Sequence, residues 1–393
     1  GLALGPGWYK GDIIFERYHD LYGDTMQAIC EVHVMMKDGS EQVVVSDNTW
    51  KSYSSPVTFS NIYDGEHYDA RKEIPGWSQP GCPAPAKGVC PGTEKLEKLT
   101  ARRNPKILKK RSFTPKVLHT KKDEIVLDFG QNITGWVEFH VSEPAGAEVV
   151  LSYGEVLQDD CFYRDNLRSA KEEYRYISNG NPAHVRPHFT FYGFRYVKVE
   201  GVSHVRAEDF TAWHIRSDVD PIGSIITGDE RVNQLFHNAM WGQFDNFLDV
   251  PTDCPQRDER LGWTGDAAII SATACKNLYM PAFFHHFIHN VEMEQNYYGG
   301  SVPFFVPAPK TPDEQDAFWL SGNPEGCAIW SDVATMMPWA VYENYGDLTL
   351  LREEYPVMKN WVEHIRKDDE ADGGRGLWLR GRQLGDWLAL DRE

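Results

Sequence analysis

The sequence predicts a multidomain chain in which two β-sandwich-type domains precede an all-helical domain. Apolar and polar residues alternate along the first half of the chain, which is typical of half-buried strands. Turn residues recur in that half at intervals of roughly ten residues, a spacing typical of the short strands of a β-sandwich. After Asp218, apolar residues recur three and four positions apart, which indicates helices.

Three segments of the first half give the strongest strand signals. MQAICEVHVMMKDGSEQVVVSD (26–47) alternates on both sides of an Asp-Gly turn, which predicts a hairpin. The alternation recurs in EIVLDFGQNITGWVEFHVSEPAGAEVVLSYGEVL (124–157) and in HFTFYGFRYVKVEG (188–201). Between the hairpin and the second segment, residues 78–111 are rich in Pro, Gly, Lys and Arg and predict a long loop.

Helical spacing dominates the second half. DERVNQLFHNAMWGQFDNFLDV (229–250) places its apolar residues on one helix face, and GDAAIISATACKNL (265–278) and LLREEYPVMKNWVEHIRKDD (350–369) also predict helices. Strands and helices do not alternate, which disfavours a doubly wound sheet or a β/α barrel. We therefore expect an N-terminal β-sandwich domain at 1–115, a second at 116–216 and a helical domain at 217–393.

The composition argues against several classes of function. With 58 acidic against 40 basic side chains the formal net charge is −18, so nucleic acids and anionic membranes would be repelled. The sequence contains no run of about 18 apolar residues, so we expect no membrane-spanning helix. The seven scattered cysteines lack the spacing of a disulfide framework or a zinc site, and they weakly favour a reducing, cytoplasmic location.

We expect both ends of the chain to be incomplete. The first residues, GLALGPGWYKG, lack the basic start and apolar core of a signal peptide, and they do not begin with Met. The last residues, GDWLALDRE, stop without any terminating signal. The catalytic unit is therefore expected to continue beyond Glu393.

The segment TDCPQRDERLGWTGDAA (252–268) crowds charged residues around one tryptophan. It contains Asp253, Arg257, Asp258, Glu259, Arg260, Trp263 and Asp266. Its proline and glycines disfavour one continuous helix. Thr264 is the predicted N-cap of a following helix, with Asp266 in the first turn, where the helix dipole favours an anion. The residues before Thr264 are expected to form a loop at the mouth of the helical domain, a usual position for catalytic groups.

Crowded carboxylates and arginines suit acid–base chemistry. Like charges raise the pKa of a carboxyl and arginines lower it, so such a loop can keep one acid protonated beside anionic neighbours. Glycoside hydrolysis needs this division, because one acid protonates the leaving oxygen while another carboxylate drives the attack. A salt-bridged surface loop is the alternative interpretation of the same residues.

This segment, DCPQRDERLGWTGDA, closely resembles the signature loop of glycoside hydrolase family 78, the α-L-rhamnosidases. Other segments resemble the same family in the order that it uses them, namely GWYKGDI, SDNTWKSYSSPVTFSNIYDGEHYDAR, DFGQNITGWVEFHV, GEVL followed by YRDNLRSAKEEYRY, FTFYGFRYVKVEG and GDWLAL. The resemblance covers nearly the whole chain. It implies that the helical domain is the first part of an (α/α)6 barrel, truncated in this chain.

The resemblance also implies roles for the charged segment. Glu259 matches the family's general acid. Asp253, Arg257, Trp263 and Asp266 match rhamnose-binding positions, where carboxylates and the guanidinium would bind hydroxyls and the indole would pack beside the ring. Two alternatives stay open: Asp266 as no more than a helix-start anion, and Trp263 as a core residue.

Two further tryptophans match the family's sugar pocket more loosely. Trp330 lies in CAIWSD, where Ile329 and Ser331 stand at positions that are more usually glycine. Trp387 lies in GDWLA and is the second candidate, with Asp386 beside it as a weaker one. A core position for Trp330 is the alternative.

The resemblance implies inversion at the anomeric carbon, which requires a base carboxylate roughly 6.5–9.5 Å from the acid. In the family this base is a glutamate far downstream, which would lie outside the present chain. Glu325 and Asp332 are weaker alternatives, as is Asp386. We expect no cofactor and no metal, since His285 and its neighbour lack a carboxylate or cysteine at ligand spacing.

The predicted function is hydrolysis of terminal α-linked L-rhamnose from plant glycosides or pectic oligosaccharides. The expected partner is a rhamnosylated small-molecule glycoside or oligosaccharide, without nucleic acid or membrane, and a homodimer is left open. Two other functions are left open as well: a non-catalytic carbohydrate-binding protein, and an exo-glycosidase that uses the same barrel for a different sugar.

Overall fold

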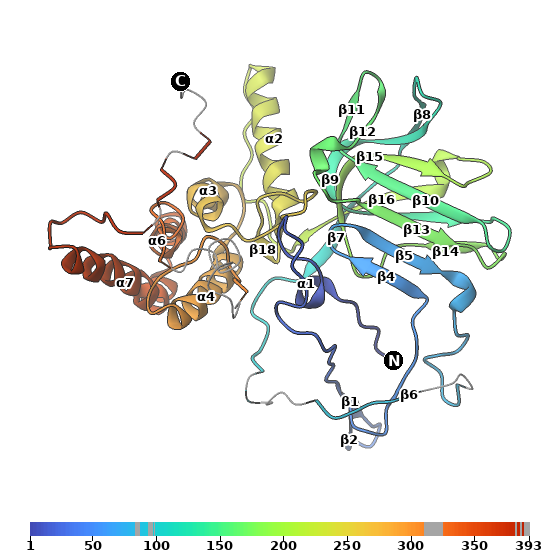
Figure 1. The fold of residues 1–393 in the computed structure, drawn as a ribbon, viewed down its shortest axis with the longest axis horizontal. Coiled ribbons are helices and arrows are strands. Elements are labelled where there is room, and N and C mark those ends of the chain that lie inside the picture. Colours follow the sequence, from blue (N-terminus) through green and yellow to red (C-terminus); the bar gives the residue numbers. More distant parts are fainter. Residues whose placement is uncertain are drawn as a thin grey trace.

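The computed structural model describes residues 1–82, 87–92, 97, 99–309, 325–381, 383–385, 387 and 388. A large β-sheet region and a group of helices lie side by side, and a small hairpin projects away from them (Figure 1). The predicted order of β structure before helices is confirmed. In the part of the chain that is described, no helix combines the length and the apolar character needed to cross a membrane.

One ten-stranded sheet holds most of the β structure. Its strands lie in the order β4 (Val57–Asn61), β5 (Gly65–Asp69), β13 (Glu173–Ile177), β10 (Glu148–Gly154), β15 (Tyr192–Glu200), β9 (Ile125–Val141), β16 (Phe210–Ser217) and β7 (Ile107–Phe113), and β8 (Lys116–His119) and β14 (Ala183–Val185) also pair with β9. Strands β4, β5 and β7 precede residue 115, so both predicted β regions contribute to this sheet. The domain division after residues 115 and 216 stays a prediction.

The long strand β9 changes partners along its length. Its first part pairs with β8 and β15, and its later part pairs with β16. Gly135 marks this change, because a Cβ there would lie 1.8 Å from Trp213 O and would force the strands apart. Aromatic residues fill the core of the sheet, where the rings of Tyr153 and Tyr192 stack with centroids 3.8 Å apart.

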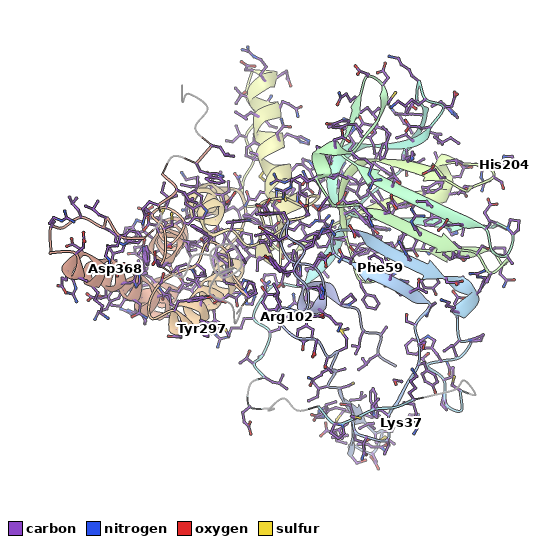
Figure 2. The ribbon with its side chains drawn as sticks, in the orientation of Figure 1. Lys37, Phe59, Arg102, His204, Tyr297 and Asp368 are labelled. Atoms are coloured by element: carbon purple, nitrogen blue, oxygen red, sulfur yellow. The ribbon has the colours of Figure 1, made fainter. Side chains whose placement is uncertain are left out.

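The predicted hairpin forms from β1 (Glu31–Met35) and β2 (Glu41–Val45). Every residue of both strands is exposed, and Figure 2 shows Lys37, at the turn, pointing away from the main sheet. The remaining short elements are α1 (Gly7–Lys10), β3 (Lys51–Ser52), β6 (Lys87–Gly88), β11 (Val156–Gln158), β12 (Cys161–Tyr163) and the 3-10 turns η1 (Ala70–Lys72), η3 (Asp165–Leu167) and η4 (Ala207–Asp209).

The predicted helices are confirmed. The helical region contains α2 (Glu230–Asn246), α3 (Thr264–Asn277), α4 (Pro281–Tyr297), α6 (Val333–Tyr345) and α7 (Leu348–Ala371). Helices α3, α4, α6 and α7 pack around a core that includes Phe283, Phe287 and Trp361. Helix α2 lies against the sheet, and its apolar positions divide: Met240 is buried, whereas Leu235 is 69% exposed.

A buried polar contact joins α2 to the sheet. Thr134 N in β9 donates to Asp245 Oδ1 at 2.9 Å, and the Thr134 hydroxyl donates to Asp245 O at 2.7 Å. Burial raises the pKa of Asp245 well above its usual range. His214 of β16 lies 3.5 Å from the same carboxyl. The C-terminal end of α2, which leads into the charged segment, is thereby fixed to the sheet.

Helix α3 begins where the sequence predicts but without the predicted cap. Asp266 lies in its first turn, as expected. The N-cap position belongs to Trp263, and Thr264 is already helical. Thr264 N donates to Phe304 O at 2.7 Å, and the Thr264 hydroxyl donates to Pro303 O at 3.0 Å. The prediction of Thr264 as N-cap is wrong because its side chain bonds to the neighbouring segment instead of to the helix.

Candidate active site

Residues 253–261, which we call the acid loop, connect the sheet-bound end of α2 to α3. The short strands β17 (Phe247–Leu248) and β18 (Val250–Pro251) precede the loop. The loop closes on itself, because Asp253 N donates to Leu261 O at 3.2 Å and Leu261 N donates to Asp253 Oδ1 at 3.0 Å. The predicted non-helical loop at the start of the helical region is confirmed.

Arg260 anchors the acid loop to the β region. Its Nη2 pairs with Glu172 Oε1 at 2.6 Å, and both side chains are completely buried. Its Nη1 donates to Ile62 O at 2.7 Å and to Phe191 O at 2.9 Å. Burial raises the pKa of Glu172, and the guanidinium of Arg260 opposes this shift. The φ of Arg260 is 54°, in the left-handed region, so the buried bonds hold a strained backbone in place.

The carboxylate of Glu259 lies between two guanidinium groups. Arg168 Nη2 is 2.5 Å from Glu259 Oε2, and Arg257 Nη2 is 3.8 Å from the same oxygen. The Glu259 side chain is 15% exposed. Its backbone carbonyl accepts a hydrogen bond from Tyr63 Oη at 2.8 Å. The residue predicted to donate a proton is thus largely sheltered from bulk solvent and is held from both the acid loop and the β region.

Asp253 is the acid-loop carboxyl with the strongly raised pKa. Burial and the negative charge of Glu259 raise the pKa of Asp253 to about 7, although Arg257 Nη2 pairs with it at 3.1 Å. The sequence predicts that Glu259 is the protonated acid. In the structure, the carboxyl with a pKa of about 7 is that of Asp253, which lies beside Glu259. The negative charge of Glu259 thus makes the ionisation of Asp253 harder.

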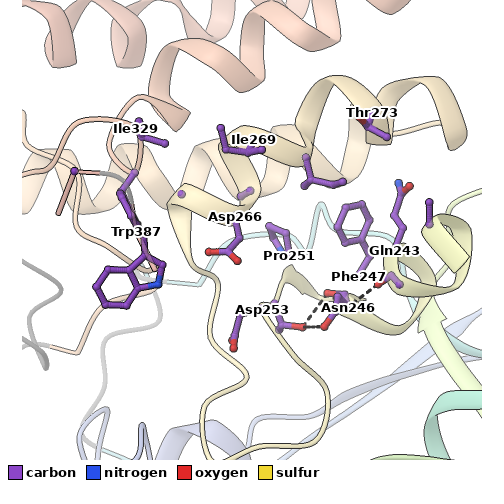
Figure 3. A pocket seen from close by; sticks show the side chains of 18 residues that line it. Gln243, Asn246, Phe247, Pro251, Asp253, Asp266, Ile269, Thr273, Ile329 and Trp387 are labelled. Atoms are coloured by element: carbon purple, nitrogen blue, oxygen red, sulfur yellow. Dashed lines mark hydrogen bonds between the residues drawn. The ribbon is translucent and has the colours of Figure 1, made fainter. Parts of the chain in front are cut away.

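A cavity of about 620 Å³ opens beside the acid loop and is lined by residues of α2 and α3 (Figure 3). Asp253 and Asp266 line it together with Trp330 and Trp387. Burial and the negative charge of Glu259 raise the pKa of Asp266. The rings of Trp330 and Trp387 meet edge to face, with centroids 6.2 Å apart. Four of the predicted sugar-binding residues are therefore brought together around one cavity.

The other three predicted site residues lie outside the cavity lining in the described part of the chain. Arg257 pairs with Asp253, which lines the cavity, and also lies near Glu259. Arg257 and Glu259 therefore adjoin the cavity without lining it. Trp263 packs against Phe305, with ring centroids 5.3 Å apart, and is partly buried. The individual roles of these residues stay predictions.

Ile329 and Ser331 flank Trp330 at positions that are more usually glycine, and the structure accommodates them in different ways. Ile329 has φ 72°, in the left-handed region where glycine is favoured. Ser331 uses its hydroxyl to donate to Val302 O at 2.6 Å. Gly265 permits the close approach of α3 to Trp330, because a Cβ there would lie 2.7 Å from Trp330 Nε1. The loosely matching segment therefore still brings its tryptophan to the cavity.

The alternative base residues are not placed as a water-activating group. Asp332 Oδ1 accepts from Trp361 Nε1 at 2.8 Å, and its Oδ2 accepts from Ile329 N at 2.8 Å, which makes it a structural carboxylate. Glu325 does not belong to the lining formed by described residues. Asp386 lies outside the described residues.

Asp253, Cys254 and Glu259 bring three potential metal-ligand atoms within 4.8 Å of one another. Two features disfavour a metal there. Arg257 already pairs with Asp253 and lies near Glu259. Burial raises the pKa of the Cys254 thiol to about 12, whereas a metal-binding cysteine must lose its proton. The cluster therefore fits proton chemistry better than metal binding.

Sequence reasoning missed the residues that hold the acid loop from outside. Arg168 and Ser169 contact its carboxylates, Glu172 pairs with Arg260, and Tyr63 bonds to its backbone. They lie within NLRSAKEEY and NIYDGEHYD, segments that carried the family resemblance but no assigned role. That resemblance was the available signal for them.

Three family models match consecutive parts of the chain. The α-L-rhamnosidase N-terminal domain matches residues 1–110, the bacterial α-L-rhamnosidase concanavalin-like domain matches 118–216, and the bacterial α-L-rhamnosidase six-hairpin glycosidase domain matches 220–393. Together these matches cover almost all of the sequence.

Curated relatives carry the same description. An α-L-rhamnosidase of Formosa agariphila is 34% identical over 373 residues, which are 93% of this chain and 39% of that protein. An α-L-rhamnosidase of Alteromonas sp. (strain LOR) is 32% identical over 400 residues, which are 99% of this chain and 41% of that protein. The chain thus spans about 40% of the length of these relatives.

Solved structures show the same fold. The native α-L-rhamnosidase of Aspergillus terreus has a TM-score of 0.91 at 32% identity, over 99% of this chain and 44% of that one. The Streptomyces avermitilis α-L-rhamnosidase complexed with L-rhamnose has a TM-score of 0.88 at 32% identity, over 98% of this chain and 36% of that one. The predicted fold class, β domains followed by the first part of an (α/α)6 barrel, is confirmed. By its acid loop, its fold and these matches, the chain belongs to glycoside hydrolase family 78, the α-L-rhamnosidases.

Proposed function

We propose that the protein is an inverting α-L-rhamnosidase that removes terminal α-linked L-rhamnose from plant glycosides or pectic oligosaccharides. The acid loop carries this proposal: Glu259 lies between two guanidinium groups, beside a carboxyl with a pKa of about 7, next to a tryptophan-lined cavity. Membership of the family supports the reaction type, and the relative solved with L-rhamnose supports the sugar.

In the proposed reaction, Glu259 donates its proton to the glycosidic oxygen as the bond between that oxygen and C1 breaks. A water oxygen bonds to C1 from the opposite face, and the proton of that water passes to a base carboxylate roughly 6.5–9.5 Å from the acid. The products are L-rhamnose with inverted anomeric configuration and the free alcohol of the aglycone. The base is expected outside residues 1–393, as the family resemblance implies.

The remaining residues of the site hold the sugar. Asp253, Asp266 and Arg257 bind its hydroxyls, and the pKa of about 7 lets the Asp253 carboxyl donate as well as accept hydrogen bonds. Trp330 and Trp387 offer apolar surfaces to the sugar ring and its methyl group. Trp263 supports this wall from its position against Phe305.

A panel of 4-nitrophenyl glycosides tests the substrate, with the whole protein as the enzyme. We expect kcat/KM for the α-L-rhamnoside to exceed that for other sugars by about 100-fold or more, because buried polar groups reject sugars that leave them unpaired. Binding of L-rhamnose without turnover would instead identify a carbohydrate-binding protein. Faster turnover of another sugar would identify a different exo-glycosidase.

Glu259→Gln tests the acid. The amide keeps the size of the side chain but its N–H protons are not acidic, so kcat for an alkyl α-L-rhamnoside should fall by about 10³-fold. The melting temperature should fall by no more than the loss of one partly exposed ion pair with Arg168 explains. Turnover near the wild-type rate would show that another group is the acid.

A homodimer is a further proposal. The hairpin formed by β1 and β2 exposes Val32, Val34 and Val44 on one face, and such patches are typical of contact surfaces. Sedimentation at micromolar concentration should show a dimer that Val34→Lys with Val44→Lys converts to a monomer. A monomeric wild type would contradict this assembly.

A further inference from the structure

Arg168 reaches the acid loop from the β region. It follows the 3-10 turn η3, at a backbone position with φ 59°. One guanidinium spans two neighbouring carboxylates: Nη2 is 2.5 Å from Glu259 Oε2, and Nε is 2.8 Å from Asp258 Oδ1. Arg168 is thus the closest described cation to the carboxylate of the proposed acid.

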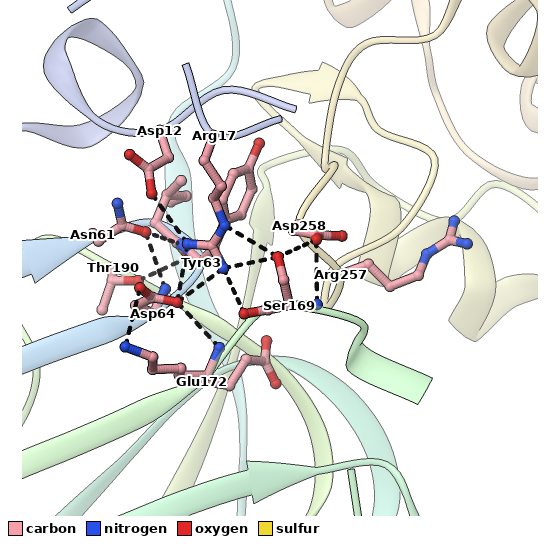
Figure 4. Close-up of polar contacts among 12 residues, drawn as sticks. Asp12, Arg17, Asn61, Tyr63, Asp64, Ser169, Glu172, Thr190, Arg257 and Asp258 are labelled. Carbon is pink, nitrogen blue, oxygen red and sulfur yellow. Dashed lines mark hydrogen bonds and ion pairs between the residues drawn. The ribbon is translucent and has the colours of Figure 1, made fainter. Parts of the chain in front are cut away.

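Contacts on both sides of Arg168 fix its direction. Ser169 N donates to Asp258 Oδ2 at 3.3 Å, and the Ser169 hydroxyl also donates to Asp258. Arg17, from the N-terminal segment, donates through Nε to Ser169 Oγ at 3.1 Å and through Nη2 to Asp64 Oδ1 at 3.1 Å (Figure 4). The N-terminal segment, the β region and the acid loop therefore form one connected polar network.

Asp258 directs the guanidinium without taking part in the chemistry. It is buried, and its two oxygens contact Arg168 and Ser169. The ion pair with Asp258 keeps the guanidinium beside the acid loop, and the hydrogen bond from Nη2 goes to Glu259. A lysine carries the same charge but has no second, rigidly oriented donor, so it cannot make both contacts with one geometry.

We infer that Arg168 is a positioning residue of this active site, which holds the Glu259 carboxylate in place for proton transfer. The inference rests on the proposed function and deepens it. As Glu259 gives its proton to the glycosidic oxygen, negative charge develops on the carboxylate, and the neighbouring cation stabilises that charge. Arg257, Asp253 and Asp266 also interact electrostatically with Glu259, and they are unchanged in Arg168 variants, so a shift of the pH profile in such a variant belongs to Arg168.

Arg168→Gln, Arg168→Lys and a matched control test this role in the whole protein. The control is Arg175→Gln, because Arg175 lies in the same region, is exposed to a similar degree (36% against 39%) and pairs with Glu173 and Glu148. For Arg168→Gln we expect kcat about tenfold lower from lost positioning. The alkaline limb of kcat/KM should move to higher pH, because a positive neighbour is gone.

The other two variants separate charge from geometry. Arg168→Lys should keep the alkaline limb of the wild type while kcat stays reduced, since only the charge is restored. Arg175→Gln should change neither quantity. An alkaline limb that stays in place in Arg168→Gln, or that moves equally in Arg175→Gln, overturns the inference, because lost structure lowers kcat without moving the limb.

A second measurement needs no activity and therefore separates this inference from the proposed function. Arg168→Gln and Glu259→Gln, singly and together, form a double-mutant cycle read out by melting temperature. Non-additive changes support the contact even if the protein hydrolyses no rhamnoside, in which case the proposed function alone fails. Additive changes show that the two side chains do not interact and overturn the inference.

Discussion

At the scale of single residues, the proposed reaction depends on the electrostatic interactions among a few charged side chains. Asp253 and Glu259 are neighbouring carboxyls, and Arg257 contacts both. Burial moves the pKa of Asp253 to about 7, so near neutral pH this residue changes between a neutral and an anionic form. Below that pH a neutral Asp253 removes a repulsive charge beside Glu259 and gains a donor for a sugar hydroxyl.

Ile329 offers a test of backbone strain beside the cavity. Its left-handed conformation costs about 1–2 kcal/mol for a residue with a Cβ, whereas glycine costs about 0.5–1 kcal/mol in chain entropy. Ile329→Gly should therefore raise the free energy of unfolding in urea by about 0.5–1 kcal/mol. The control is Ile329→Ala, which keeps the Cβ and should give no gain. Equal effects of the two substitutions would show that strain is not the cause.

The chemistry of the acid loop could be predicted from its residue types, but the contacts of those residues with the rest of the chain could not. Carboxylates, arginines and a tryptophan in one short segment indicate a proton-handling loop whatever the rest of the fold is. Arg168, in contrast, is 91 positions away from Glu259, and only the folded sheet brings the two together. The identity of the carboxyl titrating near pH 7 depends on burial, which local sequence does not report, and the structure gives Asp253 this role.

At the scale of elements, the acid loop keeps its shape because the β region holds it. The loop has no regular secondary structure, and Arg260 takes up a strained backbone conformation. The completely buried pair of Arg260 and Glu172 connects the loop to the sheet region, and the backbone carbonyls of Ile62 and Phe191 complete the connection. A misplaced Arg260 would displace the adjacent Glu259.

Glu172→Gln tests this anchor. Above the raised pKa of Glu172, about 8, the substitution leaves the Arg260 charge buried without its ionised partner, so there the free energy of unfolding should fall by about 3 kcal/mol. The sequence neighbour Glu173 provides the control, because its ion pairs are partly exposed and Glu173→Gln should cost less than about 1 kcal/mol. Equal losses for the two variants in denaturant unfolding would contradict the anchor. We also expect a lower kcat only for Glu172→Gln.

Local patterns predicted the elements that depend on local interactions. Helical spacing predicted α2, α3 and α7 but not α4 and α6, and the Asp-Gly turn predicted the exposed hairpin, since periodicity and turn chemistry act within a few residues. Strand pairing, in contrast, depends on residues far apart in the sequence. Alternation therefore could not predict that β4, β5 and β7, from the first 115 residues, join this single sheet. The start of α3 was predicted correctly, whereas its cap was not, because Thr264 bonds to residues 303 and 304.

At the scale of the whole molecule, three parts of the chain meet at the acid loop. The N-terminal segment supplies Arg17, the β region supplies Arg168, Ser169 and Glu172, and the helical region supplies the cavity. Although the whole chain has a net charge of −18, the carboxylate of the proposed acid lies between the guanidinium groups of Arg168 and Arg257. The β region therefore supplies direct contacts to the candidate site.

Composition and order of patterns predicted the class of the molecule, and the resemblance predicted its family. Acidic charge argued against nucleic acid, and alternation followed by helical spacing gave β domains before helices. The contribution of the β region to the site could not be predicted, because long-range contacts between domains leave no periodic signal. The roles of the individual site residues stay predictions until variants are measured.

The most direct test of the central claim, that Glu259 is the proton donor, is the dependence of rate on the leaving group. A proton donor matters most when the departing oxygen is strongly basic and least when it is a weak base. In the whole protein, Glu259→Gln should therefore hydrolyse 2,4-dinitrophenyl α-L-rhamnoside at nearly the wild-type rate and lose almost all activity on alkyl α-L-rhamnosides. An equal loss on both substrates would contradict the claim and assign Glu259 to binding or structure.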